Sequence, residues 1–166
     1  MAEIVMHRVD DRLVHGQVIV GWVGLHNINA IWIVDDEVAN NPMMVNIYKF
    51  AAPAGVDLAA MTIKEAGDRL LAGKESRDRV LLLAKIPQTF VQLMELGYQP
   101  QDINFGAMAH KPDGIKVGPQ TELTREEADA VERLYRTGVR IWIQLVPQGG
   151  QKPIEWEDIR QKCGYQ

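Results

Sequence analysis

Short runs of apolar residues without polar alternation are the feature that most limits how this chain can fold. The clearest run is residues 30–34, Ala-Ile-Trp-Ile-Val, which ends in two aspartates. A strand with one face in water alternates apolar and polar residues, whereas a parallel strand covered on both faces can be apolar throughout. Because parallel strands are joined by crossovers that usually contain a helix, this run predicts an α/β protein.

Strand-like and helix-like segments alternate along almost the whole chain. We expect strands at residues 4–9, 30–34, 56–61, 79–84, 103–105, 115–117 and 139–146. We expect helices at residues 16–25, 42–52, 62–73, 87–96, 124–136 and 153–163. Capping boxes at Thr62–Glu65 and Thr124–Glu127, and Asn41 before Pro42, are typical of helix starts.

This pattern predicts a single open, mostly parallel twisted sheet of about six to seven strands, with helices on both faces. The alternation weakens in the segment 106–119, which is rich in Gly and Pro. An antiparallel edge strand would fit there.

The length and composition indicate one domain, residues 1–166. The chain has 166 residues, 46% hydrophobic and 24% charged, as in an average globular domain with one core. A net charge of −4 gives no basic excess to neutralise phosphates, which argues against a nucleic-acid-binding protein. The only cysteine, Cys163, cannot form a disulfide within the chain and fits a reducing compartment.

We expect a cytoplasmic location. The first residues lack the basic region and the long apolar stretch of a signal peptide. No apolar run approaches the roughly 18 residues that are needed to cross a bilayer. Any role at a membrane would therefore come through a partner protein.

The densest group of reactive side chains follows the first expected strand. Residues 8–18 read Arg-Val-Asp-Asp-Arg-Leu-Val-His-Gly-Gln-Val. In open α/β sheets, ligands bind outside the carboxyl ends of the strands. That rim would carry the loops at residues 10–16, 35–41, 85–87, 106–118 and 147–150. The first of these loops is the richest in ionisable groups, and we expect the functional site there.

His15 is the candidate catalytic residue of this loop, because much of an imidazole is unprotonated and nucleophilic near neutral pH. Gly16 lets the backbone approach a group carried on the ring. The first amides of the helix that begins at Gly16 would stabilise an anion at that point. Arg12 could place its guanidinium on phosphoryl oxygens, and Gln17 could donate a neutral hydrogen bond.

Asp10, Asp11 and Arg8 complete the candidate site as orienting or phosphate-binding residues. Either aspartate could accept a hydrogen bond from a ring nitrogen of His15 and fix its tautomer, or pair with an arginine. The simpler interpretation is that residues 10–12 form a solvated turn and that His15 caps a helix. We favour a phosphate cradle because the loop lies on the functional rim of the expected sheet.

The remaining histidines do not indicate a metal site. His7 is expected to be a partly buried, hydrogen-bonded strand residue, and His26 a favourable cation at a helix C-terminus. His110 lies in the irregular segment 106–119 and could either approach the site or stay at the surface. No two histidines have the i, i+4 spacing of a metal-binding pair, and no acidic cluster accompanies them.

Two other functions can be weighed on the same fold. A receiver domain also has an acidic pair after its first strand and a Lys near a Pro later, as in Asp10–Asp11 and Lys85–Pro87. It needs an acceptor aspartate at the carboxyl end of its third strand, but Asp57 stands at the start of that strand, which argues against it. A non-catalytic regulatory domain that binds a phosphate or nucleotide at the Gly16 helix end stays open as an alternative.

Residues 8–18, together with Trp22, closely resemble the active-site segment of the IIB components of the mannose/fructose/sorbose family of the sugar phosphotransferase system (PTS). Weaker similarity continues at residues 34–39, 52–55, 85–87 and 106–116, so the resemblance covers essentially the whole chain. Ala107 departs from the pattern, which has an asparagine there. This departure affects a polar contact from that loop and not the central histidine.

The resemblance implies a transferase, a protein-N(π)-phosphohistidine–sugar phosphotransferase. Such a chain accepts phosphate on His15 from a phosphohistidine of a IIA partner. It then passes the phosphate to a sugar carried by the membrane-embedded IIC and IID partners. The resemblance implies no cofactor or metal, and a place at the inner membrane only through the permease. The partner-facing surface should surround His15 and include the exposed side of the segment 106–118.

Overall fold

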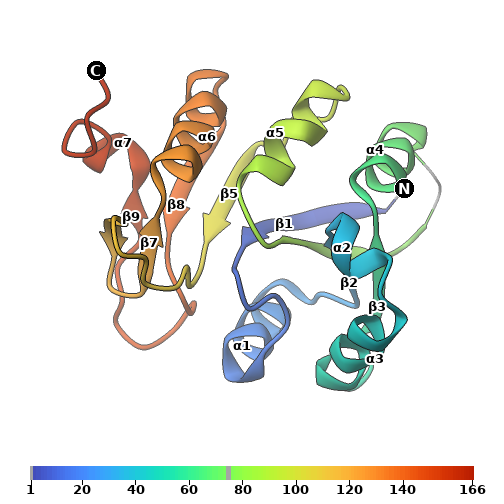
Figure 1. Ribbon diagram of the computed structural model, residues 1–166. Helices are drawn as coiled ribbons and strands as arrows, with labels where there is room; N and C mark the ends of the chain where they lie inside the picture. Colours follow the sequence, from blue (N-terminus) through green and yellow to red (C-terminus); the bar gives the residue numbers. More distant parts are fainter. Residues whose placement is uncertain (1, 74–75) are drawn as a thin grey trace.

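The computed structural model describes residues 2–73 and 76–166 (Figure 1). Within them, one sheet has the strand order β3-β2-β4-β1-β5-β8-β9. All neighbours are parallel except β9, which pairs antiparallel with β8 at the edge. The strands are β1 (Glu3–Val9), β2 (Ala30–Val34), β3 (Asp57–Met61), β4 (Arg79–Ala84), β5 (Asp102–Phe105), β8 (Arg140–Ile143) and β9 (Ile154–Glu155). The predicted fold class is confirmed.

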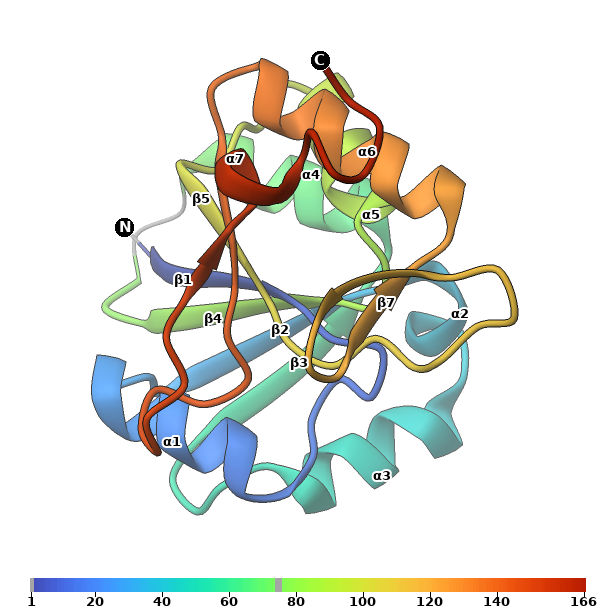
Figure 2. The ribbon, with the colours of Figure 1, turned by 90° about the vertical axis from the view of Figure 1, so that its left-hand side faces the viewer.

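Helices cover both faces of this sheet. They are α1 (Gly16–His26), α2 (Asp36–Ala39), α3 (Pro42–Ala51), α4 (Ile63–Ala72), α5 (Gln88–Glu95), α6 (Arg125–Arg136) and α7 (Trp156–Ile159). Figures 1 and 2 show α1 and α3 on one side of the sheet and α4, α5 and α6 on the other. In the two described ranges, none of the helices has the length and apolar character that crossing a membrane requires.

The apolar run of β2 serves both helix layers. All five of its residues are buried. Ile31 and Ile33 pack in the core beneath α1 and α3, whereas Trp32 and Val34 pack in the core on the opposite face. Coverage on both faces is therefore the reason that this strand shows no polar alternation.

The connections that leave β1 and β5 run in opposite directions. From β1 the chain crosses through α1 to β2, and from β5 it crosses through α6, on the other face, to β8. Because β1 and β5 are neighbours in the sheet, their carboxyl ends form a topological switch point, the usual ligand site of open α/β sheets. The loop that carries His15 follows β1 at this point.

The predicted helix starts are confirmed by their side-chain hydrogen bonds. Thr62 with Glu65 and Thr124 with Glu127 form complete capping boxes at α4 and α6. The Asn41 side chain accepts from the Met44 amide at 3.2 Å at the start of α3. These signals depend on residues three apart, which is why the sequence reveals them.

The structure differs from the sequence prediction in three places, two of them in the C-terminal third. The antiparallel edge strand is β9 and not part of the segment 106–119, whose strand β6 (Ile115–Gly118) pairs with the unpredicted β7 (Thr121–Leu123) in a separate hairpin. The helix expected over residues 153–163 is replaced by β9 and the short α7, because Ile154 pairs with Ile143 and covers the free edge of β8. The unpredicted α2 has only four residues, too few for a periodic pattern.

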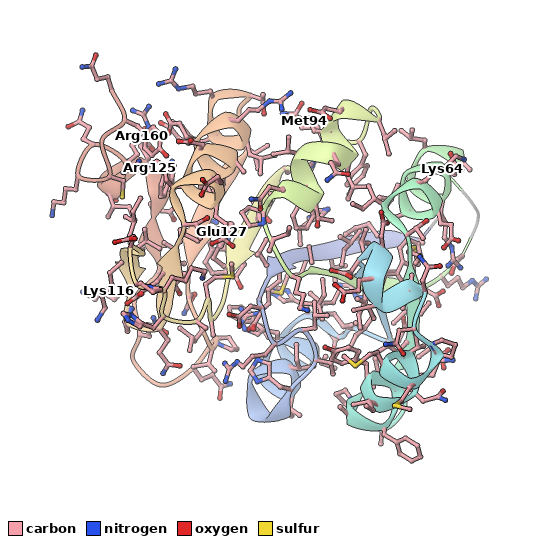
Figure 3. All side chains as sticks on the ribbon, in the orientation of Figure 1. Lys64, Met94, Lys116, Arg125, Glu127 and Arg160 are labelled. Atoms are coloured by element: carbon pink, nitrogen blue, oxygen red, sulfur yellow. The ribbon has the colours of Figure 1, made fainter. Side chains whose placement is uncertain are left out.

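A buried carboxylate fastens the C-terminal segment to α6. Glu132 accepts hydrogen bonds from Trp156 Nε1 at 3.0 Å, Arg136 Nε at 2.8 Å and Arg160 Nε at 2.9 Å. Arg160 is labelled in Figure 3, where it lies beside α6 and α7. Burial alone would raise the pKa of Glu132, but these hydrogen bonds outweigh it and lower the pKa to about 2.

Glu132→Gln should reduce the free energy of unfolding at neutral pH by up to about 3 kcal/mol, since one pKa unit corresponds to about 1.4 kcal/mol. A lowered folded pKa gives stability that is present above the unfolded pKa, roughly 4.3. That stability is lost as the pH falls to the folded value of about 2. Urea unfolding at pH 7 and at pH 3 should therefore show a smaller gap between wild type and variant at pH 3.

Glu126→Gln, an exposed position on the same helix, is the matched control. It should change the unfolding free energy by less than about 0.5 kcal/mol at either pH. Equal losses in the two variants would contradict the assignment.

Candidate functional site

His15 lies between β1 and α1, at the position before the first helical residue. Its backbone is extended, with φ −154° and ψ 134°, and its side chain makes no capping hydrogen bond. The imidazole points instead at Asp10, with Nε2 3.2 Å from Oδ2 of that carboxylate. The side chain is 22% exposed, so the ring is held on one side and open to solvent on another.

The loop before His15 is held in a strained conformation. Leu13 has a φ of 56°, in the left-handed region, which costs an L-residue about 1–2 kcal/mol. Its completely buried side chain and the hydrogen bond from its amide to the Asp10 carbonyl, 3.0 Å, hold it there. Gly16 has a φ of 42°, where glycine is favoured. Strain of this kind is commonly kept where a loop presents a functional group.

Asp10 is the hub of the site and is completely buried. Its Oδ2 accepts from Arg8 Nη2 at 3.1 Å and faces His15 Nε2, and its Oδ1 accepts from the Arg12 amide at 3.0 Å. A carboxylate can only accept, so in a neutral His15 ring Nε2 must carry the proton. Nδ1 is then the nitrogen with a free lone pair.

Arg8 lies beneath Asp10 and is completely buried as well. Its guanidinium donates to Asn104 Oδ1, to the Gln144 carbonyl at 3.1 Å, to the Leu145 carbonyl at 3.0 Å and to Asp10. Burial lowers the pKa of Arg8 to about 10, although Asp10 opposes the shift, so the side chain stays charged at neutral pH. In this position Arg8 can orient Asp10, but it lies too deep to bind a group on the exposed side of His15.

Gly106 lies directly against this ion pair. A Cβ atom there would meet Arg8 Nη2 and would lie 2.5 Å from Asp10 Oδ2. The Gly106 carbonyl in turn accepts from Thr121 Oγ1 at 2.7 Å. The close approach, and not an unusual φ, is what requires glycine here.

Asp11 and Arg12 lie beside the loop after β5. Asp11 Oδ2 accepts from the Ala109 amide at 2.6 Å, and the Asp11 amide donates to the Ala107 carbonyl at 3.1 Å. The Arg12 side chain is 48% exposed and its Nε lies 3.8 Å from Asp10 Oδ1. Both residues line a depression of about 340 Å³ that the loop from Ala107 to His110 borders. Arg12 is thus the exposed cation beside the His15 loop.

The Gln17 side chain lies outside the described part of the structure. Its backbone belongs to the first turn of α1, which carries no acidic residue. An acidic side chain in the first turn of a helix would compete with a bound anion for the free amides there. The first turn of α1 has none, so its own side chains supply no such competitor for the amides from Gly16 onward.

The other histidines have partners elsewhere. His7 Nε2 lies 2.6 Å from the Tyr98 hydroxyl, and burial lowers the pKa of His7 to about 4. His26 stacks on Trp22 at 6.1 Å between ring centroids. His110 Nδ1 lies 2.8 Å from Glu122, whose pKa this hydrogen bond lowers. Among the described residues, no group of three or more His, Cys, Asp or Glu side chains is placed to hold a metal ion.

A model of the protein family described as "PTS system sorbose subfamily IIB component" matches residues 4–164. The chain belongs to this family. It is a IIB component of the phosphotransferase system, and so a transferase of sugar transport.

Individual relatives match most of this chain. The N-acetylgalactosamine-specific phosphotransferase enzyme IIB component 2 of Escherichia coli (strain K12) is 30% identical over 147 residues, which are 89% of this chain and 93% of that protein. The mannose-specific EIIAB component of the same strain is 28% identical over 139 residues, 84% of this chain and 43% of that protein. The crystal structure of manxB from Thermoanaerobacter tengcongensis matches with a TM-score of 0.90 at 29% identity and covers 99% of both chains.

In this IIB component the structure adds residues that the sequence analysis did not single out. Asn104, Gln144 and Leu145 hold Arg8, and the Leu145 carbonyl also accepts from Trp22 Nε1 at 2.7 Å. Asn104 could have been noticed in the sequence, because it is a polar residue in an apolar strand. The backbone carbonyls of Gln144 and Leu145 could not be predicted as partners of Arg8, because every residue has a carbonyl.

Gly106→Ala should lower the free energy of unfolding by about 1–3 kcal/mol, because the added methyl displaces a buried guanidinium and carboxylate. Gly24→Ala is the control, since a Cβ there meets nothing within 4 Å and alanine favours a helix. Urea unfolding measures both. A Gly106→Ala variant as stable as wild type would show that Arg8 and Asp10 can move freely.

Proposed function

We propose that His15 carries a phosphoryl group on Nδ1, accepting it from a phosphohistidine of a IIA-type partner and passing it to a sugar. The observation that supports this is the 3.2 Å contact of His15 Nε2 with the buried Asp10, which leaves Nδ1 unprotonated on a partly exposed ring. An imidazole held in one tautomer is a better-aimed nucleophile than a freely rotating one.

In the transfer step, the Nδ1 lone pair of His15 forms a bond to phosphorus while the bond from phosphorus to the donor nitrogen breaks. The proton stays on Nε2, where Asp10 accepts its hydrogen bond and stabilises the charge that the ring gains. Donor and acceptor are both histidines, so the step should be close to balanced and reversible. When the group passes to a sugar, the hydroxyl oxygen forms a bond to phosphorus as the bond from phosphorus to Nδ1 breaks. The hydroxyl proton leaves to solvent, and the electron pair of the broken bond returns to Nδ1.

The charge on the transferring oxygens needs stabilisation, since phosphoryl transfer depends mostly on positioning and electrostatics. Arg12 is the exposed cation beside the loop, and the amides of α1 from Gly16 onward point to the helix end. In this proposal Asp10 orients the imidazole of His15, and Arg8 in turn orients Asp10. Asp11 supports the loop. Gln17 remains a candidate donor. With these groups in place, we expect the step to need no metal or nucleotide.

The proposed partners are a IIA protein or domain and the IIC and IID permease subunits, with the chain in the cytoplasm and at the membrane only through them. The name of the mannose-specific EIIAB relative places a IIA and a IIB component in one protein.

The surface next to His15 is uncharged along α1, which has no Asp, Glu, Lys or Arg and exposes Val20. Such a neutral surface, bordered by charged loops, suits transient docking. The relatives are named for different sugars, N-acetylgalactosamine and mannose, so the substrate is proposed only as a sugar.

Incubation with a phosphorylated IIA-type donor should label the chain on His15. The label should be stable in base and labile in acid, and His15→Gln should abolish it. Peptide mapping after base treatment locates it. A label that is labile in both acid and base would indicate an aspartyl phosphate, and an unlabelled wild-type chain with several IIA donors would favour a phosphate-binding regulatory domain.

Arg12→Ala should slow phosphorylation of His15 by roughly 10- to 100-fold, because one cation is lost from the transferring phosphate. Arg12→Lys should retain part of the rate, since it keeps the charge but loses the planar fork. Arg133→Ala removes the same charge from the exposed face of α6 and should leave the rate unchanged. Rapid-quench measurement of labelled His15 gives the rates. Equal rates for wild type and Arg12→Ala would rule out the assigned role.

A further inference from the structure

Asn104 lies on β5 directly beside Arg8 of β1 in the parallel register. It is 1% exposed, and both ends of its amide are used. Oδ1 accepts from Arg8 Nη1, and Nδ2 donates to the Gln144 carbonyl at 3.2 Å. Arg8 Nη1 donates to the same carbonyl at 3.1 Å. The three groups close a ring in which the amide needs both its acceptor and its donor.

This ring fixes one end of the guanidinium. The other end, Nη2, donates to Asp10 at 3.1 Å and to the Leu145 carbonyl at 3.0 Å. Because a guanidinium is planar and rigid, fixing Nη1 also fixes the direction from which Nη2 meets Asp10. Asn104 therefore influences the carboxylate that holds His15 without touching the imidazole.

The charge of Arg8 decides what Asp10 does to His15. A buried carboxylate without a counter-charge would hold the imidazole as a cation, and an imidazolium has no lone pair for attack. With Arg8 as its partner, Asp10 is balanced and can orient the ring while Nδ1 stays free. A neutral amide at position 104 preserves this balance, whereas a carboxylate would disturb it.

We propose that Asn104 is a positioning residue for phosphoryl transfer at His15, because it holds Arg8 on Asp10 so that Asp10 orients the imidazole without charging it. The proposal rests on the proposed function of His15. The charged groups in contact with this cluster, within the described ranges, are Arg8 on β1 and Asp10 and Arg12 on the loop. β5 and the loop after β8 contribute neutral groups to it, and α1 contributes no charged side chain.

Asn104→Asp tests this balance, because it nearly keeps the shape of the side chain and adds one negative charge beside Arg8. It also loses the hydrogen bond that Nδ2 donates to the Gln144 carbonyl, a loss that Asn104→Leu shares. Arg8 then faces two carboxylates, and His15 becomes the group that can supply the missing positive charge. The midpoint of the His15 titration, followed by NMR of the unphosphorylated chain, should rise by about one pH unit. Phosphorylation by a IIA-type donor should then slow most at low pH and recover as the pH rises, because only the neutral imidazole has a lone pair for attack.

Two control variants separate this effect from general damage. Asn46→Asp adds the same charge at an exposed position of α3 and should leave the midpoint unchanged. Asn104→Leu removes both hydrogen bonds without adding charge, so it should slow transfer at every pH and raise the midpoint by less than Asn104→Asp does. If the Asn104→Leu variant does not fold, Asn104→Ser serves as the uncharged control in its place.

An unchanged midpoint in Asn104→Asp, or an equal rise in Asn46→Asp, would overturn the proposal. The titration uses no donor, so it is independent of phosphoryl transfer. A raised midpoint in a chain that is never labelled on His15 would refute the proposed function and still support the link between Asn104 and His15.

Discussion

A completely buried ion pair, Arg8 with Asp10, is the interaction on which the site depends. Removing two charges from water costs several kcal/mol per ion, and only a well-satisfied set of hydrogen bonds offsets that cost. The partners come from separate parts of the chain: the loop after β1, Asn104 on β5, and two carbonyls after β8. Neighbouring strands bring them together, and Gly106 leaves the space that they fill. The order of strands in the sheet is therefore part of the site.

The same ion pair accounts for the shape of the loop above it. Asp10 accepts from the Arg12 amide and its carbonyl accepts from Leu13, so the chain turns tightly around the carboxylate. This turn places Leu13 in a strained conformation and brings His15 back to the same carboxylate. Burial of Leu13 stabilises the strained turn, and the loop presents one imidazole in a fixed orientation at the switch point of the sheet.

Local signals predicted most of the fold. The apolar runs located the main strands of the sheet apart from β9, and the capping boxes located α4 and α6, because both signals lie within a few residues of each other. The elements that the sequence did not predict are α2, β7 and β9, each of two to four residues. Such short elements form because of what they pair with. Ile154, for example, becomes a strand residue by covering the open edge of β8.

The sequence by itself determined which loop carries the reactive groups and that His15 is its candidate nucleophile, since these residues are close together in the chain. Only the tertiary structure decided that Asp10 and not Asp11 faces His15, and that Nε2 is the nitrogen it holds. It also decided that Arg8 is buried while Arg12 is exposed, and that Asn104 completes the network. The physical reason is that burial and hydrogen-bond partners depend on the sheet order, which joins residues far apart in the sequence.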